Sequence, residues 1–368
     1  MSENGSFNAS NQERSDAANE ACFVNDSTTV KVARITAYCI LILVSLCGNS
    51  VIIAVVWKER SMRKTINFFI VNMCVADLLI TLYMPRVISQ ALAGYEWLVS
   101  GILGLIFCKL SVFMHQTAIA ASILTVVAIS CDRFFAVVFP LKTFITKKSC
   151  RVIISVIWIS SVTIRLPMFY GLKIRVEHTG KLGCFLSLDD TFNKGAEKTY
   201  YKFTLISLFA VPLSAIAILY SGILISLKLR NVPGEDVSGN TSREQKRDVV
   251  IKKKVLRMVL IVVAVFVLCW LLFFIQLILF SYKIQVACEV LFMRLFLAHL
   301  NSAMNPCLYL VLNENFREGF KHILRRCPLN WCFVSQRISP LNSTTLSYRD
   351  PARDEERTSN NERRNTGL

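Results

Sequence analysis

Residues 110–131 read LSVFMHQTAIAASILTVVAISC, a run of 22 residues without Asp, Glu, Lys or Arg between Lys109 and Asp132. A helix of roughly 20 mostly apolar residues is long enough to cross the hydrocarbon core of a bilayer. A surface helix of a soluble protein would instead carry its apolar residues as a stripe on one face. This stretch therefore predicts a transmembrane helix.

Six further stretches of the chain have the same character. They are 35–57, 65–85, 152–172, 203–227, 258–282 and 295–313, and they contain only two charged residues, Asp77 and Arg165. The chain of 368 residues is 54% hydrophobic and 18% charged, with a mean hydropathy of +0.47. Average soluble domains are about 45–50% apolar and about 25% charged, so an ordinary soluble enzyme and a disordered protein are excluded. We predict an all-α membrane protein, a seven-transmembrane helix bundle.

The loops between these stretches give the orientation. Lys and Arg follow the first and third stretches, and nine of them lie between Lys228 and Arg257, whereas 91–103 has none. Since cytoplasmic loops carry the excess of Lys and Arg, we expect a multi-pass protein of the plasma membrane with an extracellular N-terminus. The net charge of +17 then belongs largely to loops that face membrane lipid, and no nucleic-acid partner is expected.

The first segment carries glycosylation signals. Three Asn-X-Ser sequons begin at Asn4, Asn8 and Asn25. Such sequons are used only on the outer side of the membrane, in agreement with the orientation. We therefore expect 1–31 to be an extracellular glycosylated N-terminus, followed by the seven-transmembrane domain 32–312.

The C-terminal part divides into two segments. Residues 313–326 include FREGFKHILRR, which is basic and amphipathic and predicts a short membrane-surface helix on the inner leaflet. The polar remainder, 327–368, predicts a disordered cytoplasmic tail. Cys327 and Cys332 follow the basic run directly, where S-palmitoylation would add a lipid anchor.

Four of the 13 cysteines are expected on the oxidising outer side: Cys22, Cys108, Cys184 and Cys288. Four cysteines allow three pairings, and the residues alone leave all three open. A bond between Cys108 and Cys184 would hold the loop after the fourth stretch over the start of the third. A bond between Cys22 and Cys288 would then be the second.

Polar side chains within the stretches are costly in a membrane and point to function. Asp77 lies in the second stretch, and Asn301, Ser302 and Asn305 share one side of the seventh because they are spaced i, i+1 and i+4. If the two groups meet, oxygen ligands surround one carboxylate and a small cation such as Na⁺ could bind. The alternative is a hydrogen-bond network that holds helices together.

Together these features resemble the rhodopsin-like (class A) G protein-coupled receptors from about Thr36 to Phe320. The chain is similar to that family at Gly48-Asn49, NMCVADLL with Asp77, Trp97 ahead of Cys108, CDRF (131–134), Trp158, Pro167, Pro212 with Tyr220, FVLCW (266–270), NPCLY (305–309) and FREGF (316–320). Each motif is weak alone, but their order along seven spans is specific. The resemblance implies a signalling receptor rather than an enzyme, with a ligand pocket outside and a heterotrimeric G protein site inside.

The resemblance also implies roles for individual residues. The switch between the two sites would involve Asp132, Arg133, Tyr220, Pro306 and Tyr309. An allosteric sodium site would use Asp77, Ser122, Asn301 and Asn305 beside Trp270, and no other cofactor is implied. The resemblance implies the Cys108–Cys184 disulfide as well. It further implies arrestin and receptor kinases as partners, acting on tail hydroxyls such as Ser339, Ser343, Thr344, Thr345 and Ser347.

Two positions depart from the family pattern. Leu272 stands where the family usually has the Pro of its CWxP motif, so the sixth helix lacks the proline that usually kinks it. Lys252 stands where many members have a Glu that pairs with the motif arginine, and it would repel Arg133. We therefore predict appreciable signalling without ligand.

The ligand class is narrowed by two further positions. His115 stands where amine receptors have an Asp, and His299 stands where opsins have the retinal-bearing Lys, so an amine or light receptor is not expected. The chain is most similar to the peptide-receptor branch, in particular to receptors for tachykinin, RFamide and galanin-type neuropeptides. Helical spacing predicts a pocket formed by His115, Gln116, Ile119, Trp270, Phe273, Phe274, Leu277, Arg294 and His299. Asp189 and Asp190 are expected to meet a basic peptide at its mouth.

Other functions are weighed against this one. A class A receptor for a non-peptide small molecule or lipid is the alternative within the family. A transporter or channel could use Asp77 as an ion relay, but the chain has no internal repeat of the kind that transporters often have. A membrane enzyme would need a metal cluster or a nucleophile with a base, and His115, His178, His299 and His322 are expected to be too scattered to form one.

Overall fold

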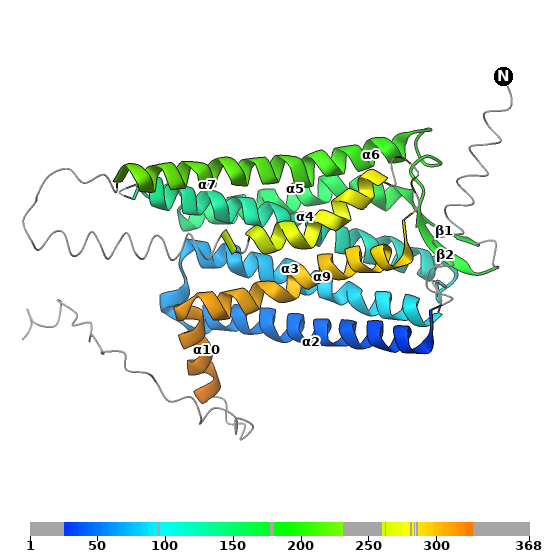
Figure 1. Cartoon of the computed structure of the whole chain (residues 1–368), viewed down its shortest axis with the longest axis horizontal. Helices are drawn as coiled ribbons and strands as arrows, with labels where there is room; N and C mark the ends of the chain where they lie inside the picture. Colours follow the sequence, from blue (N-terminus) through cyan, green and yellow to red (C-terminus); the bar gives the residue numbers. More distant parts are fainter. Residues whose placement is uncertain are drawn as a thin grey trace, which may run out of the picture. The chain divides into compact units, whose positions relative to one another are not determined.

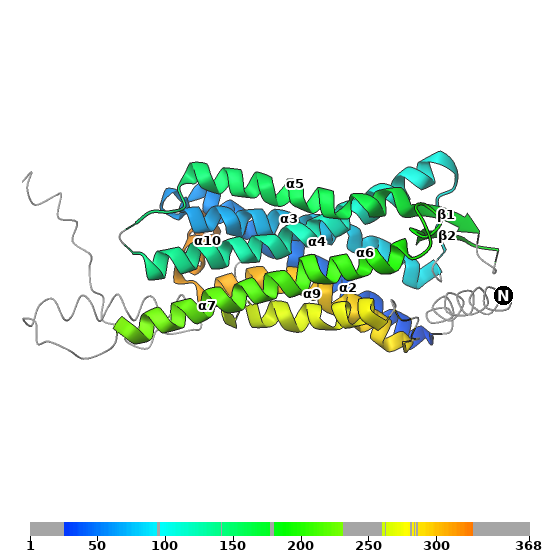
Figure 2. The ribbon, with the colours of Figure 1, turned by 90° about the horizontal axis from the view of Figure 1, so that it is seen from above.

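The computed structural model describes residues 26–93, 96–140, 142–176, 180–230, 260–261, 263–279, 282, 284 and 286–326. Its long helices are α2 (Thr28–Lys58), α3 (Thr65–Ala93), α4 (Gly101–Val138), α5 (Lys147–Gly171) and α9 (Cys288–Leu312), which lie side by side (Figures 1 and 2). A sixth is continuous through α6 (Ala196–Leu205), a π-helical turn (Ile206–Ala210) and α7 (Val211–Arg230). A shorter apolar helix, Val263–Leu279, falls within the predicted stretch 258–282. The predicted seven-helix bundle is confirmed.

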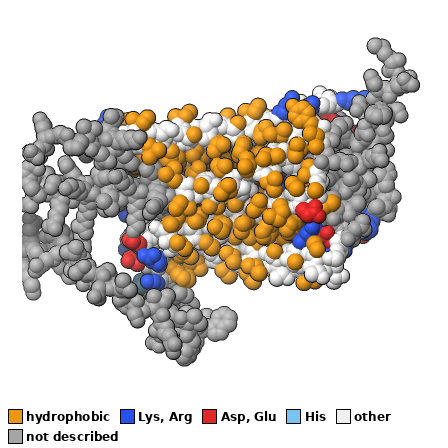
Figure 3. All heavy atoms as spheres, in the orientation of Figure 1, with side chains coloured by type: hydrophobic (Ala, Val, Ile, Leu, Met, Phe, Trp, Pro, Cys, Tyr) orange, Lys and Arg blue, Asp and Glu red, His pale blue; other side chains and the backbone are white. Residues whose placement is uncertain are grey.

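The surface of the bundle is apolar where lipid would contact it. Within the described residues, six helices are long and apolar enough to cross a membrane. Large side chains such as Leu82, Ile102 and Ile218 are at least 70% exposed. Figure 3 shows hydrophobic atoms over the middle of the face in view, with charged side chains toward the two ends. Soluble monomers rarely expose apolar patches of this size, so the surface fits the hydrocarbon core of a bilayer.

Hydrogen bonds between polar side chains connect the helices inside the bundle. The Asn72 side-chain amide on α3 donates to Thr125 Oγ1 on α4 at 2.8 Å. Trp158 Nε1 on α5 donates to Asn72 Oδ1 at 2.9 Å. Because no water competes for these groups in a bilayer, such bonds help to specify which helices pack together.

Helices α2 and α9 pack closely at a proline. Pro306 lies inside α9 and has no N–H to donate to the carbonyl of Ser302, one turn earlier. Asn49 Nδ2 on α2 donates to that carbonyl at 3.1 Å. The approach requires glycine at position 48, because a Cβ there would lie 2.6 Å from Pro306 Cγ. Gly48 and Asn49 therefore pack against α9 at Pro306, where that helix lacks one backbone hydrogen bond.

A β-hairpin lies at the outer end of the bundle, between α5 and α6 (Figures 1 and 2). Strands β1 (Leu172–Val176) and β2 (Leu182–Leu186) pair antiparallel, with Ile174 opposite Cys184. The Cys108–Cys184 disulfide, with a Cα–Cα distance of 5.9 Å, holds this hairpin against the start of α4, as predicted. Cys288 is also disulfide-bonded, while its predicted partner Cys22 lies outside the described residues.

The short helix α10 (Glu314–Arg326) follows α9 and includes the predicted amphipathic segment. Gly319 lies against Val55 of α2, since an added Cβ would be 2.6 Å from Val55 Cγ1. His322 Nδ1 lies 2.5 Å from Glu59 Oε1, just after α2. These contacts place α10 beside the inner end of α2.

Several predictions concern residues outside those that the structure describes. They are the sequons at Asn4, Asn8 and Asn25, the palmitoylation of Cys327 and Cys332, the tail hydroxyls, His178, and the position of Lys252 on which expected ligand-free signalling depends. They stay predictions.

Candidate functional site

A cavity of about 300 Å³ lies at the outer end of the bundle, next to the disulfide-bonded hairpin. Its lining comes from α3, α4, α5, α6, α9, the Val263–Leu279 helix and the hairpin. Five of the nine residues predicted for the pocket line it, namely His115, Gln116, Phe273, Leu277 and Arg294. These five residues lie on α4, on the Val263–Leu279 helix and on α9.

The other four predicted residues, Ile119, Trp270, Phe274 and His299, are buried and are not part of the lining. Trp270 packs edge-on against the lining residue Phe273, with ring centroids 5.5 Å apart. The Phe274 ring stacks on Phe209 at 4.6 Å. Trp270 and Phe274 therefore contact the lining through Phe273.

Two histidines meet next to the cavity. His115 Nε2 on α4 lies 2.9 Å from His299 Nε2 on α9, and His299 Nδ1 lies 3.2 Å from the Tyr38 hydroxyl on α2. The expectation that the histidines are scattered is wrong for this pair, because helix packing brings together residues 184 positions apart. Within the described part of the chain, no group of three His, Cys, Asp or Glu could hold a metal ion. His115, His299 and Tyr38 therefore connect α4, α9 and α2 next to the cavity.

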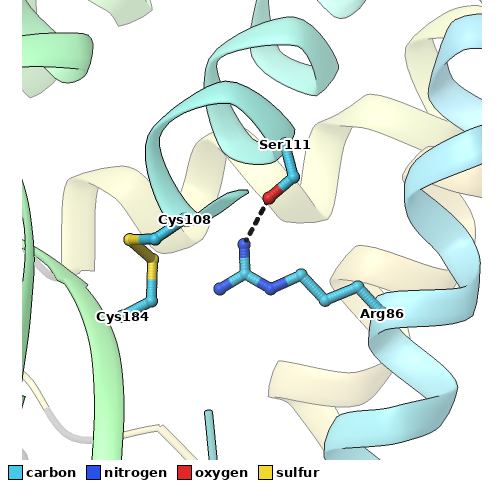
Figure 4. The surroundings of a disulfide bond; sticks show 4 residues. All are labelled: Arg86, Cys108, Ser111 and Cys184. Atoms are coloured by element: carbon cyan, nitrogen blue, oxygen red, sulfur yellow. Dashed lines mark hydrogen bonds between the residues drawn. A yellow bond between two sulfur atoms is a disulfide. The ribbon is translucent and has the colours of Figure 1, made fainter. Parts of the chain in front are cut away.

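Two arginines that were not predicted as ligand contacts also line the cavity, Arg86 on α3 and Arg165 on α5. Arg165 is only 3% exposed, and its Nη1 donates to the Tyr200 hydroxyl at 3.4 Å. Arg86 Nη1 donates to Ser111 Oγ at 3.3 Å, close to the disulfide (Figure 4). With Arg294, the lining contains three arginines and neither Asp nor Glu.

The carboxylates expected at the mouth already have partners in the loop. Asp190 forms an ion pair with Arg175 and accepts a hydrogen bond from Ser187 Oγ at 2.5 Å. The Ser187 hydroxyl and then the Arg175 guanidinium lower the pKa of Asp190 from its ordinary value of 3.8. Asp189 Oδ1 accepts the backbone N–H of Glu197 at 2.8 Å, in the first turn of α6. Both carboxylates therefore stabilise the loop itself.

A buried polar cluster lies deeper in the bundle. Asn305 Nδ2 on α9 donates to Asp77 Oδ2 on α3 at 2.8 Å, so the two predicted groups do meet. The buried oxygens without a hydrogen-bond partner include Asp77 Oδ1, Asn49 Oδ1, Ser122 Oγ and Ser302 Oγ. Asn301, which the resemblance also implies as a sodium ligand, is buried as well. Buried polar atoms without partners are rare, and carboxylate, amide and hydroxyl oxygens are the ligands that hard cations prefer.

The residues that the resemblance implies for the switch lie toward the inner end. Arg133 pairs with its neighbour Asp132 at the end of α4. The Tyr309 hydroxyl on α9 donates to Met73 Sδ on α3 at 3.6 Å, and the Tyr220 side chain on α7 is buried. These groups come from four helices, so a relative movement of the helices would change their contacts.

Known proteins similar to this chain agree with this architecture. Residues 48–309 match the family described as 7 transmembrane receptor (rhodopsin family). A QRFP-like peptide receptor of Branchiostoma floridae is 30% identical over 351 residues, covering 89% of this chain and 87% of the relative. The Substance-P receptor of Aquarana catesbeiana is 30% identical over 298 residues, and that of Homo sapiens is 29% identical over 297 residues. Each of these two alignments covers 79% of this chain and 70% of the relative.

Proposed function

The chain belongs to the rhodopsin family of seven-transmembrane receptors, and from that membership we propose that it is a G protein-coupled receptor for a neuropeptide. It is a multi-pass protein of the plasma membrane, and its family is a class of receptors rather than of enzymes. The observation that carries the peptide assignment is the outer cavity beside the disulfide-bonded hairpin, in a chain whose relatives are peptide receptors.

The contacts of the bundle support a two-state mechanism. A ligand in the outer cavity would contact His115 and Phe273, which touch His299 and Trp270 beneath them. Helix α9 carries Pro306 below this point, where the missing backbone bond makes bending easier. A ligand that binds one helix arrangement more tightly shifts the population toward it, and the inner ends then open to a heterotrimeric G protein.

The buried polar cluster fits an allosteric sodium ion. Asp77 would supply a carboxylate and its neighbour Asn305 an amide, and the buried side chains of Ser122 and Asn301 would supply the remaining neutral ligands. A bound cation would neutralise the buried carboxylate and favour one helix arrangement. Asp77→Asn should remove the effect of NaCl, compared with an equal concentration of choline chloride, on agonist affinity. A sodium effect that persists in Asp77→Asn would contradict this assignment.

The cytoplasmic partners extend beyond the G protein. Phosphorylation of the tail hydroxyls by receptor kinases would create an arrestin site, because each phosphate adds charge and strong acceptors. The amphipathic α10 presents basic residues such as Lys321 and suits anionic membrane lipid. Palmitoylation of Cys327 and Cys332 would strengthen that attachment.

The test is activation of the full-length receptor in transfected cells by a panel of synthetic neuropeptides, read as calcium and cAMP. His115→Ala should weaken the potency of an activating peptide about tenfold or more, the equivalent of about 1.4 kcal/mol. Met114→Ala is the matched control, since Met114 is the adjacent residue on α4 and is exposed at 43%. If no peptide activates a receptor that reaches the cell surface, the peptide assignment is wrong.

A further inference from the structure

The charged residues that line the outer cavity are all of one sign. Three arginines line it, and none of its lining residues is acidic. Positive charge that is partly withdrawn from water is costly unless an anion compensates it. The charge of the lining residues therefore indicates which kind of ligand the cavity binds.

Arg165 is the strongest single observation. It lies on α5, inside a membrane-spanning helix, and is 3% exposed. Its Nε is buried without a hydrogen-bond partner, and its Nη1 has only a long bond, 3.4 Å, to the neutral Tyr200 hydroxyl. Among the described residues, no carboxylate forms an ion pair with it. A guanidinium has five N–H donors that suit a carboxylate, so Arg165 keeps most of its bonding capacity open.

Arg86 lines the same cavity from α3. Its guanidinium carbon lies 4.6 Å from the centre of the Trp97 ring and 5.3 Å from that of Tyr83, which hold it in place. Its Nε is also buried without a partner. Arg86, Arg165 and His115 all line this one cavity of about 300 Å³.

The neighbouring acidic groups have other partners. Glu197 Oε1 accepts the hydroxyl of the lining residue Tyr201 at 2.6 Å. Asp189 and Asp190 stabilise the loop, as described above. Arg294, the third arginine of the lining, also has an interaction partner.

We propose that this pocket selects peptides that carry a carboxylate, which binds Arg165 and Arg86 together. This inference rests on the proposed function and specifies the ligand class of that same site. A carboxylate accepts paired hydrogen bonds from a guanidinium in a fixed geometry, and these charge-assisted bonds are strong where water is excluded. A lysine or arginine side chain of a ligand would meet like charge instead, so a basic end of a peptide is disfavoured in this part of the pocket.

The carboxylate has two possible sources, an Asp or Glu side chain or a free C-terminus, and one experiment separates them. The full-length receptor is expressed in cells and tested with a panel of synthetic neuropeptides. Each activating peptide is then remade with Asp or Glu changed to Asn or Gln, and separately with its C-terminal carboxylate changed to an amide. One of the two changes should weaken potency about 30-fold or more, the loss expected when a buried charge pair is broken.

Variants of the receptor link the effect to the arginine. Arg165→Gln should weaken the acidic peptide by a similar factor, and the neutralised peptide should lose little further potency on that variant. Arg165→Lys should restore part of the potency, and staining of surface receptor separates a binding defect from a folding defect. Arg151→Gln is the matched control, because this exposed arginine lies on the same helix, about 21 Å along the axis from Arg165.

The possible outcomes are distinct. If peptides activate the receptor but both neutralised forms keep their potency, or if Arg165→Gln at normal surface level leaves potency unchanged, the carboxylate inference is overturned while the peptide function stands. If activating peptides lack any carboxylate, the inference is likewise overturned. If no peptide activates the receptor, the proposed function fails and the inference fails with it.

Discussion

Replacement of Asn49 by Leu isolates the contribution of one side chain to the α2–α9 interface. Asn49 Nδ2 supplies the hydrogen bond that the Ser302 carbonyl cannot receive from Pro306. Ser302 is fully buried, so water cannot take over this role. Leu has the same branched arrangement of side-chain heavy atoms as Asn but no donor, and the carbonyl would then be left without a partner.

Two sets of magnitudes bound the effect. Leaving a buried acceptor unsatisfied costs about 1–3 kcal/mol in soluble proteins, whereas interhelical hydrogen bonds in a membrane protein average about 0.6 and reach about 1.7 kcal/mol. The membrane values are the closer comparison, so we expect a loss of about 0.6–1.7 kcal/mol. At about 2–4 °C per kcal/mol, the melting temperature should fall by about 1–7 °C.

A double-mutant cycle tests the cause. Pro306→Ala restores a backbone N–H to α9, which can donate to the Ser302 carbonyl in place of Asn49. The stability of detergent-solubilised receptor is measured for wild type, Asn49→Leu, Pro306→Ala and the double variant. Ser50→Leu, at an exposed position on the same helix, serves as the control. The double variant should lose less stability than the sum of the two single changes, and a strictly additive loss would refute the reasoning.

Three further changes have defined outcomes. Gly48→Ala should lower the melting temperature by the equivalent of about 1–3 kcal/mol, because the new Cβ would lie 2.6 Å from Pro306 Cγ, and Pro306→Ala should relieve part of that loss in the same thermal assay. Peptide potency should fall equally in Cys108→Ser, in Cys184→Ser and in the double variant, because each removes the same disulfide. Unequal losses at matched surface expression would show another role for one cysteine. Because the pKa of Asp190 is lowered, the stability that its carboxylate gives the loop is fully present above the ordinary pKa and is lost only as the pH falls through the lower, folded-state value. Asp190→Asn should therefore change peptide potency by the same factor at about pH 7 and about pH 5. A smaller factor at pH 5 would count against the ion pair.

The sequence predicted the features that depend on local pattern. Long uncharged stretches located the helices, since the bilayer sets their length and composition. Asp77 and Asn305 were expected to meet, and they form a hydrogen bond. The Cys108–Cys184 disulfide followed from the family resemblance and is present. The order of motifs along the chain was therefore sufficient for the fold and for the contact between Asp77 on α3 and Asn305 on α9.

The chemical character of the pocket could not be predicted in the same way. In the sequence, Arg86 directly follows the predicted stretch 65–85, and Arg165 interrupts the stretch 152–172. A charged residue inside a span is itself a sign of function, but it does not show which group the residue binds. That Arg165 faces the cavity depends on the rotation of α5, which sequence spacing does not fix. The His115–His299 contact likewise depends on the packing of α4 against α9.

The central claim is that a peptide bound at the outer end changes the inner end for a G protein. The most direct measurement is guanine-nucleotide exchange by purified heterotrimeric G proteins, with the full-length receptor in lipid nanodiscs and the most potent peptide of the panel. The account predicts a saturable rise in exchange with peptide, and its loss in Arg133→Ala at unchanged peptide binding. Exchange that stays flat for every G protein class while the peptide is bound would contradict it.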